Sequence, residues 1–583
     1  MRTTLVVYLN SDDALLLWTA DELDDRLKGF AIEREIAHAG GAPTTGWLDN
    51  YASPGPEKHQ NGEHLPSDKF PFRTFTWTDH SVNEGDTVRY RAVPVLEGEA
   101  TPNETLASEW SERRTLGPSH GGYSAFFNRG FVISQFVSRF LDEKFPGLDR
   151  EDALKKFKQE ITAQLESTMR RFLAGQILTT MVGLLDEVLA SDDQVFAALF
   201  ELNDEALVSK LESLGPRAHL VLANGSIQHQ KGARSADERT QDENAAARAR
   251  LLAKQVDVAQ TDRFVSPGAL AHNKFLVVAD AQGNAKRVWT GSTNWTTTGL
   301  CTQLNNGLLI DDKDVAGAYL SQWNVLREAK SGHPSTLARS NATPTQIGDD
   351  VPGTTRASVH FTRAPSAQKP DRPLDLEALA EIVGSAKEGV LFLMFIPGGS
   401  GTLADVRQLV DDKPELLVRG VVSELPKGRQ DEKEGPTTRV KVTIFGAGDR
   451  ISGPRVFDVV QPEGMKHPAA NWAIETTREQ FLGAIGHAII HSKVLVVDPF
   501  SDDPTVVTGS HNFSSSASQK NDENFIVVRG DRALAEAYVV NVESAWRHYA
   551  GRAGNPHPNL KGIDYLRALL EDQRPHESFW RLS

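Results

Sequence analysis

The sequence has very little cysteine: one residue, Cys301, in a chain of 583. A single thiol cannot form an internal disulfide, and it cannot supply a cysteine-rich zinc cluster. A disulfide-stapled secreted framework and a structural zinc fold are therefore excluded, and the composition fits a reducing, cytoplasmic compartment. We expect Cys301 to be a buried and unreactive thiol.

Long hydrophobic runs and an excess of positive charge are also missing. No stretch of about 18 uninterrupted apolar residues occurs, so we expect no integral membrane segment. The 63 Lys and Arg residues face 78 Asp and Glu residues, which gives a net charge of −15. This balance argues against broad, non-specific attraction to DNA or to an anionic bilayer. A local basic pocket and a peripheral membrane contact stay open.

Several signals and motifs are absent as well. The first apolar stretch reaches Asp12 and Asp13 without a small-residue cleavage site, so we predict no signal peptide, while export by another route stays open. The chain contains no Walker loop, no G-x-S-x-G elbow and no H-E-x-x-H motif. The segment GSIQHQKG has no acidic partners at metal-ligand spacing. We therefore expect no metal site and no cofactor.

The composition is otherwise that of a globular protein, 39% apolar and 24% charged, in a chain long enough for several cores. Residues 1–118 contain short strands separated by polar turns, the pattern of an all-β sandwich. Trp18, the strand GFAIER and the run DHSVNEGDTVRYRAVPV resemble a fibronectin type III module, in which a Trp and a Tyr on facing strands fill the core. An unspecified immunoglobulin-like sandwich is the alternative. We expect no chemistry here, only packing, targeting or substrate presentation.

Beyond this module the chain predicts an α/β fold that is duplicated. Helical periodicity begins near residue 151, and the buried strands VFAALFEL and AHLVLANG follow. After a linker rich in Pro, Ser, Thr and Gly the same order returns: helix LDLEALAEIVGSA, strand VLFLMFIP, helix TLADVRQLVDD and strand LLVRGVVSE. We assign a first catalytic unit to residues 119–340, the linker to 341–372 and a second catalytic unit to 373–583.

One pattern of chemistry-bearing residues occurs twice. The first half reads AHNKFLVVADAQGNAKRVWTGSTNW and the second reads IIHSKVLVVDPFSDDPTVVTGSHNF. Residues two apart on a strand share a face, so the polar side chains of each copy project together. They are His272, Lys274, Ser292 and Asn294 in the first copy and His491, Lys493, Ser510 and Asn512 in the second. One copy alone would be a solvated strand or a turn, but two copies in the same order within a duplicated fold favour a functional site.

These motifs resemble those of the phospholipase D superfamily. Its duplicated His-x-Lys-(four residues)-Asp motif and downstream Gly-Ser-x-Asn meet across a pseudo-two-fold axis in one active site. The resemblance covers roughly residues 123–583 and implies two α-β-α sandwich units that share this site. The second copy fits fully, with Asp498 at the motif position, whereas the first has Ala279 there and Asp280 one residue late. The resemblance implies a structural, orienting role for Asp280 and Asp498.

A further polar residue lies eleven positions beyond each motif Asn: Asn305 in the first copy and Glu523 in the second. The resemblance implies that an acidic residue here accepts a hydrogen bond from an imidazole. A carboxylate partner raises the pKa of an imidazole, whereas an amide oxygen fixes the tautomer without adding charge. We expect Glu523 to hold a protonated His491 and Asn305 to orient a neutral His272. The alternative is a polar pair at a strand start with no catalytic role, above all for Asn305.

The residue types support metal-independent cleavage of a phosphodiester. Such a reaction needs a nucleophile, a proton for the leaving oxygen and positive donors around the phosphoryl oxygens. We predict that neutral His272 attacks phosphorus to give a phosphohistidine and that His491 protonates the leaving alcohol. The lysine and asparagine pairs would hold the phosphoryl oxygens, and Ser292 and Ser510 would contact the substrate. The two imidazoles should then face each other across one phosphate-sized gap, within about 10 Å.

Three functions compete for this site, and we expect a monomer in each case. An enzyme that acts on a phospholipid headgroup is favoured because both motif copies lie in one chain; hydrolysis and transfer to another alcohol share the phosphohistidine. A nuclease acting on DNA or RNA is the alternative, and the net charge of −15 weakens it. An inactive binding or scaffold protein is suggested by Asp280 and Asn305, but the retention of both His, both Lys and both Asn opposes it.

Overall fold

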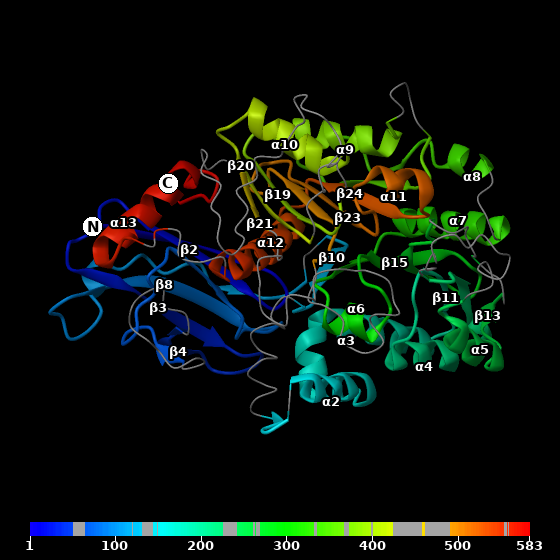
Figure 1. Cartoon of the computed structure of the whole chain (residues 1–583), viewed down its shortest axis with the longest axis horizontal. Helices are drawn as coiled ribbons and strands as arrows, with labels where there is room; N and C mark the ends of the chain where they lie inside the picture. Colours follow the sequence, from blue (N-terminus) through cyan, green and yellow to red (C-terminus); the bar gives the residue numbers. More distant parts are fainter. Residues whose placement is uncertain are drawn as a thin grey trace. The chain divides into compact units, whose positions relative to one another are not determined.

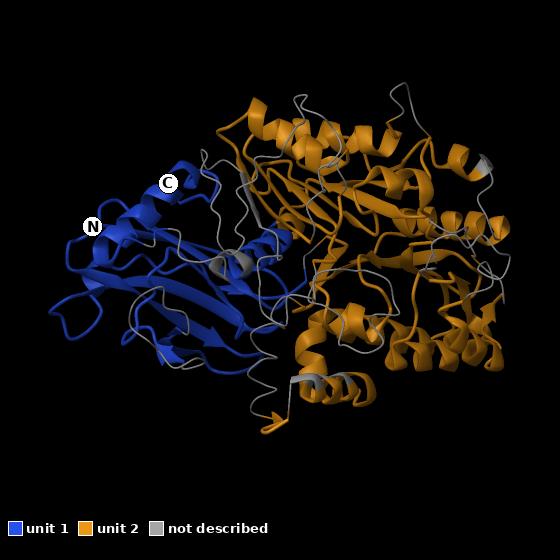
Figure 2. Ribbon diagram, viewed as in Figure 1, with its two compact units in different colours: residues 1–119, 536–583 blue, residues 120–535 orange. Residues whose placement is uncertain are grey.

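The computed structural model describes residues 1–50, 64–118, 121–130, 144–148, 150–225, 242–259, 263, 269–330, 335–365, 372–397, 400–423, 457–460, 490–552, 557 and 559–582. The chain divides into two compact units (Figure 2). The first unit combines Met1–Ser119 with Glu536–Ser583, and the second unit is His120–Ala535.

The first unit contains two larger antiparallel sheets. One has the strand order β1 (Thr3–Leu9), β2 (Ala14–Ala20) and β7 (Thr76–Asp79). The other has the order β4 (Thr44–Trp47), β3 (Leu27–Ala37), β8 (Thr87–Leu96) and β9 (Arg114–Thr115). A short separate pair joins β5 (Asp49–Asn50) to β6 (Leu65–Pro66).

The two larger sheets of the first unit share one apolar core. Side chains alternate between the two faces of a strand, and in β8 this alternation sends Tyr90 inward. Tyr90 lies in the same buried cluster as Trp18 of β2, whose ring meets Phe30 edge-on at a centroid separation of 6.0 Å. A Trp and a Tyr from different sheets thus contribute to this core, as the sequence pattern predicts.

The C-terminal helix belongs to this first unit. α13 (Gly562–Gln573) places Leu566 and Leu570 in the core that the two sheets share. An apolar sheet face must be buried against another element, and here a segment from the far end of the chain contributes to that cover. The second catalytic unit, expected at 373–583, therefore ends near residue 535, where α12 (Arg532–Arg552) leads the chain into the first unit.

The second unit contains two mixed sheets, one from each half of the predicted duplication (Figure 1). The first sheet has the order β10 (Tyr123–Phe127), β16 (Asn306–Ile310), β15 (Ala285–Gly291), β14 (Lys274–Ala279), β11 (Gln194–Leu199), β12 (Ala218–Leu222) and β13 (Asp257–Val258). The second has the order β17 (Thr345–Ile347), β18 (Arg356–Phe361), β24 (Asn524–Arg529), β23 (Thr505–Gly509), β22 (Val494–Val497), β19 (Gly389–Met394), β20 (Leu417–Val422) and β21 (Phe457–Val460).

The two sheets have the same topology apart from the extra edge strand β17. In each, the five strands that begin with β10 or β18 pair in antiparallel fashion, and the last three pair in parallel. Each strand of the first sheet therefore has a counterpart in the second sheet, with equivalent residues at equivalent positions along it. This repetition allows a motif residue in one half to be compared directly with its counterpart in the other.

Helices connect and cover these strands. In the first half they are α2 (Arg150–Ala163), α3 (Thr168–Leu189), α4 (Glu205–Leu214), α5 (Ala245–Ala253), α6 (Thr297–Cys301) and α7 (Lys313–Ala329). In the second half they are α8 (Ser335–Ser340), α9 (Leu374–Gly384), α10 (Thr402–Asp412), α11 (Ser515–Lys520) and the start of α12.

Helix α3 is the one described helix that is long and apolar enough to cross a membrane by length and composition. It is broken at Gly175, which has a φ of 52° and lies so close to the Phe127 carbonyl that a Cβ would meet the oxygen at 2.5 Å. Its buried side chains join the core of the first half, which also contains Cys301. These contacts are those of a core helix, and burial raises the pKa of the Cys301 thiol to about 12, which confirms the expected buried thiol.

Leu566→Ala should destabilise the first unit, because Leu566 is fully buried at 0% exposure in the shared core. Truncation of a buried leucine costs about 2–5 kcal/mol. The matched control is Leu560→Ala, since Leu560 is 38% exposed; its effect should stay below about 0.5 kcal/mol. Urea unfolding read by hydrogen exchange in β3 and β8 separates this unit from the second. Equal stability of the two variants would contradict the place of α13 in this core.

Candidate active site

The two motif histidines lie close together within the second unit, with their rings edge to face. Their ring centroids are 6.5 Å apart with an angle of 71° between the ring planes. Both rings are buried, and each histidine lies just before a strand: His272 stands two residues before β14, and His491 stands three residues before β22. The expectation that the two imidazoles lie within about 10 Å of each other is confirmed.

Backbone bridges between the two halves bring these histidines together. Ala271 pairs with Asp522, and Ile490 pairs with Leu304, each in a short parallel bridge. Through them the amide of His272 donates to the Asp522 carbonyl at 2.8 Å, and the amide of His491 donates to the Leu304 carbonyl at 2.9 Å. Each histidine is therefore held by the segment that precedes β16 or β24 of the opposite half.

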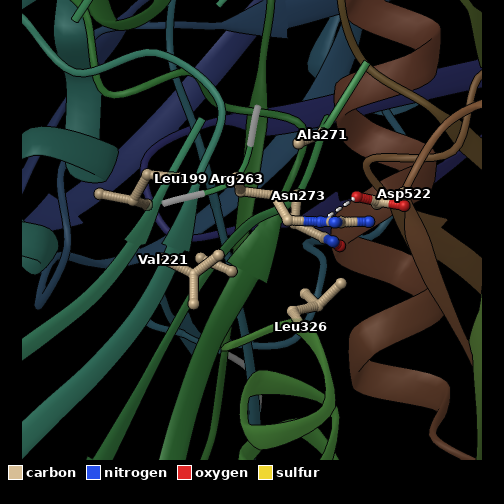
Figure 3. Close-up of a pocket in the computed structure, with 8 residues that line it drawn as sticks. Leu199, Val221, Arg263, Ala271, Asn273, Leu326 and Asp522 are labelled. Carbon is tan, nitrogen blue, oxygen red and sulfur yellow. Dashed lines mark hydrogen bonds and ion pairs between the residues drawn. The ribbon is translucent and has the colours of Figure 1, made fainter. Parts of the chain in front are cut away.

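A buried ion pair anchors one of these bridges. Arg263 Nε donates to Asp522 Oδ2 at 2.8 Å, and both side chains are almost completely buried (Figure 3). The pair lies beside a small cavity whose lining includes Asn273 and Leu326. A buried carboxylate is stable only when it is paired and hydrogen-bonded, so Arg263 fixes the residue whose carbonyl positions His272.

The same bridges exchange the polar partners of the two histidines. Glu523 follows Asp522, and its Oε1 lies 3.2 Å from His272 Nδ1. Asn305 follows Leu304, and its Oδ1 lies 2.9 Å from His491 Nδ1. The expectation that Glu523 holds His491 and Asn305 holds His272 is therefore wrong. The reason is that a parallel bridge sets each partner residue beside the histidine of the other half.

The carboxylate of Glu523 is built into a network that keeps it ionised. Its Oε2 accepts the Asn512 amide at 3.0 Å, and its Oε1 accepts Asn521 Nδ2 at 2.7 Å. Burial acts to raise the pKa of Glu523, but the interactions with His272 and these donors outweigh it and lower the pKa to about 2. A fixed negative charge therefore faces His272 Nδ1.

His272 itself is neutral at neutral pH. Burial lowers its pKa to about 4, and Lys274 acts in the same direction, although Glu523 opposes both. With Nδ1–H directed at the Glu523 carboxylate, the lone pair of Nε2 is available to an electrophile. This is the protonation state that a nucleophilic imidazole requires.

His491 is also neutral in the free protein. Asn305 Nδ2 donates to the Gly299 carbonyl at 2.8 Å, so its Oδ1 faces His491 Nδ1 and also accepts the Ser292 hydroxyl at 2.8 Å. Burial, followed by the charges of Lys493 and Lys274, holds the pKa of His491 well below its usual range. The amide partner orients this ring without supplying the charge that would stabilise its cation.

Each motif lysine lies between its own histidine and an aromatic ring. Lys274 Nζ donates to the His272 carbonyl at 2.7 Å, and Lys493 Nζ donates to the His491 carbonyl. The ammonium of Lys274 is 4.9 Å from the centroid of Phe200, and that of Lys493 is 4.8 Å from the centroid of Phe395. Cation–π contacts thus help to hold both charges beside the gap.

These two phenylalanines are the site residues that motif reasoning missed. Phe200 also packs edge-on against His272 at 4.8 Å, and Phe395 packs against His491 at 5.1 Å. Each is the first residue after a corresponding strand of its half: β11, which pairs with β14, or β19, which pairs with β22. The available signal was the repeated Phe at the end of two apolar runs in a duplicated fold, VFAALF and VLFLMF.

The two motif serines are fully buried and contact protein groups. Ser292 Oγ accepts the amide of Asn306 at 3.0 Å, and Ser510 Oγ accepts the amide of Asn524 at 3.1 Å. These hydrogen bonds tie the end of β15 to β16 and the end of β23 to β24. The contacts give Ser292 and Ser510 a positioning role in place of the expected contact with substrate.

The two motif asparagines differ in their surroundings. The backbone amide of Asn512 donates a hydrogen bond to the carboxylate of Glu523. Asn294 donates from Nδ2 to Glu201 Oε2 at 3.0 Å, a contact that the motif did not predict. Each asparagine stands two residues beyond the buried serine of its half.

The late Asp280 does not replace Asp498. Asp498 accepts the backbone amides of residues 387–389 at 2.7–3.1 Å, which ties the end of β22 to the start of β19. Asp280 instead accepts amides within its own turn, from Gln282 and Asn284. In the first half the equivalent link comes from Gln194 Nε2, which donates to the carbonyls of residues 280 and 281 at 3.3 and 3.1 Å. Asp498 is thus a structural residue as expected, whereas Asp280 only caps a turn.

Among the residues that the structure describes, no group of three or more His, Cys, Asp or Glu side chains could hold a metal ion. The gap is instead bordered by two ammonium groups, two imidazoles and two amides. Positive charge and hydrogen-bond donors around a small gap suit a phosphoryl group.

Comparison with known proteins agrees with this geometry. A sequence model of the family described as "Cardiolipin synthase, PLD-like domain" matches residues 191–326 and 449–546. The two matched segments contain both His-x-Lys motifs and both Gly-Ser-x-Asn motifs. The chain contains a PLD-like domain.

Two relatives named "Phospholipase D" match a short part of the chain. The protein from Rickettsia felis (strain ATCC VR-1525 / URRWXCal2) is 43% identical over 53 residues, which are 9% of this chain and 24% of the relative. The protein from Rickettsia prowazekii (strain Madrid E) is 45% identical over 53 residues, 9% of this chain and 23% of the relative. The chain therefore spans about a quarter of the length of the relatives it matches.

Three solved structures resemble the chain weakly. Phosphatidylserine synthase of Haemophilus influenzae Rd KW20 aligns at a TM-score of 0.38 and 12% identity, covering 70% of this chain and 93% of that one. Polyphosphate kinase of Porphyromonas gingivalis aligns at 0.40 and 10% identity, covering 99% and 82%. Nuc of Salmonella typhimurium, a phospholipase D family member, aligns at 0.18 and 18% identity, covering 33% and 96%.

Asn305→Asp should raise the pKa of His491, because a carboxylate at this position stabilises the imidazolium that an amide leaves unsupported. The pKa of His272 should stay near 4. Titration of isotope-labelled histidines by NMR measures both rings in one sample. The matched variant Glu523→Gln should alter the titration of His272 and spare His491. A shift of His272 in Asn305→Asp would refute the exchange of partners between the halves.

Proposed function

We propose that this protein is a phosphodiesterase of phospholipase D type, which cleaves a phospholipid headgroup ester through a phosphohistidine. The observation that carries the proposal is the pair of neutral imidazoles 6.5 Å apart, bordered by Lys274 and Lys493. One phosphorus can lie between two groups at this separation, with attack from one side and departure from the other. The relatives that match the chain carry names of the same chemistry.

In the first step His272 Nε2 attacks the phosphorus. An N–P bond forms, and the P–O bond to the leaving alcohol breaks. Glu523 keeps Nδ1–H in place and stabilises the positive charge that the ring acquires as the bond forms. His272 is therefore assigned as the nucleophile because a carboxylate lies beside it. The assignment does not depend on a charge difference between the two imidazoles, since both are neutral in the free protein.

His491 provides the proton for the leaving oxygen. Burial, together with the charges of Lys493 and Lys274, lowers the pKa of this ring and keeps it neutral in the free protein. An anionic phosphodiester in the gap offsets their charge and raises the pKa of the ring, so that substrate binding and protonation are coupled. In the second step neutral His491 takes a proton from water, the oxygen attacks phosphorus, and the N–P bond to His272 breaks. An alcohol in place of water would give transfer in place of hydrolysis.

Two features favour a phospholipid substrate over the alternatives: the net charge of the chain and the retention of the site residues. A nuclease would have to attract a polyanion to a chain of net charge −15. An inactive scaffold would have no reason to retain a buried carboxylate beside an imidazole, because burying such a pair costs free energy. We further propose that the first unit is a fibronectin type III-like module that presents or targets the substrate, and that the protein acts in the cytoplasm as a monomer.

Trapping should identify the attacking residue. With a reactive ester whose leaving group needs no proton, His491→Ala should accumulate a phosphoryl group on residue 272, because attack proceeds and the water step lacks its base. His272→Ala should form no adduct. Mass spectrometry of the digested protein locates the group. A phosphoryl group on His491 in the wild type would reverse the two roles while retaining the phosphohistidine route.

Turnover should survive chelation, because among the residues that the structure describes no group of three or more His, Cys, Asp or Glu side chains could hold a metal ion. Purified protein in EDTA is assayed against phosphatidylcholine, bis-p-nitrophenyl phosphate and single-stranded DNA side by side. The rate should change by less than about two-fold on adding EDTA, which corresponds to less than about 0.4 kcal/mol of activation free energy. Loss of activity in EDTA with recovery in Mg²⁺ or Zn²⁺ would overturn the mechanism.

A further inference from the structure

Each half of the second unit has a buried polar residue at the end of the strand that pairs with β16 or β24. Asn128 is the first residue after β10, and Thr362 is the first residue after β18. The two strand pairs have the same register, so Asn128 and Thr362 occupy equivalent positions. Their exposed fractions are only 1% and 0%. Neither residue belongs to the repeated motifs, and neither takes part in the two reaction steps.

Both side chains bind the backbone of a histidine partner. Opposed residues of an antiparallel pair normally exchange two hydrogen bonds between their backbone groups. Here the backbone amides of Asn128 and Thr362 donate to the carbonyls of the partners at 3.4 and 3.0 Å, but the returning bond goes to a side chain. The Asn305 amide donates to Asn128 Oδ1 at 2.8 Å. The Glu523 amide likewise donates to Thr362 Oγ1 at 2.7 Å.

Thr362 also fixes the carboxylate of Glu523. Its Oγ1 donates to the Asn521 carbonyl at 2.7 Å, and Asn521 Nδ2 donates to Glu523 Oε1 at 2.7 Å. One hydroxyl therefore holds both the backbone of Glu523 and the residue that orients its side chain. The same Oε1 lies 3.2 Å from His272 Nδ1, a distance at which a small displacement breaks the contact.

Asn128 fixes Asn305 in a comparable way. Its Nδ2 lies within 2.7–3.2 Å of three carbonyls in residues 299–303, at the C-terminal end of α6. Carbonyls at a helix end have no partner within the helix and are satisfied by such side chains. Asn305 Nδ2 donates to one of the same groups, the Gly299 carbonyl, at 2.8 Å. The orientation of Asn305 Oδ1 toward His491 therefore depends on a segment that Asn128 holds.

We propose that Asn128 and Thr362 are an equivalent pair of positioning residues, each of which holds the polar partner of one imidazole. Removal of either side-chain acceptor would leave a buried amide without its hydrogen bond, and this cost is large enough to displace the segment that carries the amide. The partner would then move relative to its ring. The inference rests on the proposed function, since the histidine that each residue serves determines which chemical event it supports.

The two residues should support different events within the first step. Thr362 serves the nucleophile His272, so loss of its hydroxyl should slow attack on every ester. Asn128 serves His491, which protonates the leaving alcohol, so loss of its acceptor should slow only esters whose leaving group needs a proton. A residue that merely stabilised the fold would not distinguish between leaving groups.

The test compares, at each position, one variant that has a hydroxyl with one that lacks it. Thr362→Ser retains the acceptor and Thr362→Val removes it. Asn128→Thr and Asn128→Val both lose the amide, and only threonine keeps an oxygen for the Asn305 amide. First-turnover rates are measured with bis-p-nitrophenyl phosphate, whose leaving group needs no proton, and with phosphatidylcholine, whose leaving group needs one. Inhibition by inorganic phosphate reports the binding of an anion.

Thr362→Val should slow the first turnover about ten-fold on both substrates, whereas Thr362→Ser should stay within about three-fold of the wild type, because small misplacements of a reacting group are costly. Asn128→Val should be slower than Asn128→Thr by a similar factor on phosphatidylcholine and equal to it on bis-p-nitrophenyl phosphate. Inhibition by phosphate should be the same in all four variants. The control is Thr402→Val, a buried threonine whose hydroxyl makes no hydrogen bond with a described residue, and it should match the wild type.

NMR of isotope-labelled histidines in the free protein tests the inference without turnover. The Nδ1 signal of His272 should change in Thr362→Val and stay unchanged in Asn128→Val, and the signal of His491 should show the reverse. If Thr362→Val does not fold, Thr362→Ala takes its place against the same serine variant.

Two results would overturn the inference. One is equal behaviour of the hydroxyl variant and the valine variant at a position, and the other is a change of the wrong imidazole in the NMR comparison. Failure of the proposed function is distinct from both: the wild type would then cleave neither substrate, while the NMR signals would still show whether each residue holds the partner of its histidine.

Discussion

The candidate site depends on two reciprocal backbone hydrogen bonds between the halves of the second unit. The amides of His272 and His491 each donate to a carbonyl that directly precedes the partner residue of the opposite half. Side chains reinforce the arrangement: Thr290 Oγ1 donates to Asn524 Oδ1 at 3.0 Å, and Asn306 Nδ2 donates to Thr508 Oγ1 at 2.7 Å. Because these contacts are buried and directional, a small shift between the halves would break several of them together.

This constraint sets the electrostatics of the site. Two ammonium groups and two imidazoles are buried together, and Glu523 places a carboxylate beside one of the two rings. Both imidazoles are therefore neutral in the free protein, although one of them must later donate a proton to the leaving alcohol. The missing negative charge is the one that a phosphodiester brings, so the free protein is prepared for an anion and is incomplete without it.

Sequence reasoning was sufficient for the duplication, for the gathering of the motif residues and for a Trp–Tyr contribution to the core of the first unit. These features follow from local periodicity and from repeated spacing, which a linear sequence displays directly. It could not determine which half supplies the partner of each histidine, because Leu304 and Asp522 pair through short bridges that have no sequence signature. It also misassigned residues 536–583, since the apolar face of α13 fits any core of similar shape.

Smaller errors have the same origin. Ser292 and Ser510 look like substrate contacts in the motif, yet a hydroxyl after a glycine can equally accept the amide of the neighbouring strand. Asp280 looks like a displaced motif residue, yet a shift of one position moves a side chain to the opposite face of a strand. Gln194 takes over the link from a distant position, which only the folded chain reveals.

The exchange of partners also constrains how such a protein can change over time. After a gene duplication the two copies are in principle independent, and each can accumulate substitutions on its own. Here the residue that governs the first histidine is encoded in the second copy, and the residue that governs the second histidine is encoded in the first. A recombination event that replaced one half would bring in its own histidine together with the partner of the other one. The two halves are therefore inherited as a single unit of chemistry, although the chain still displays them as two.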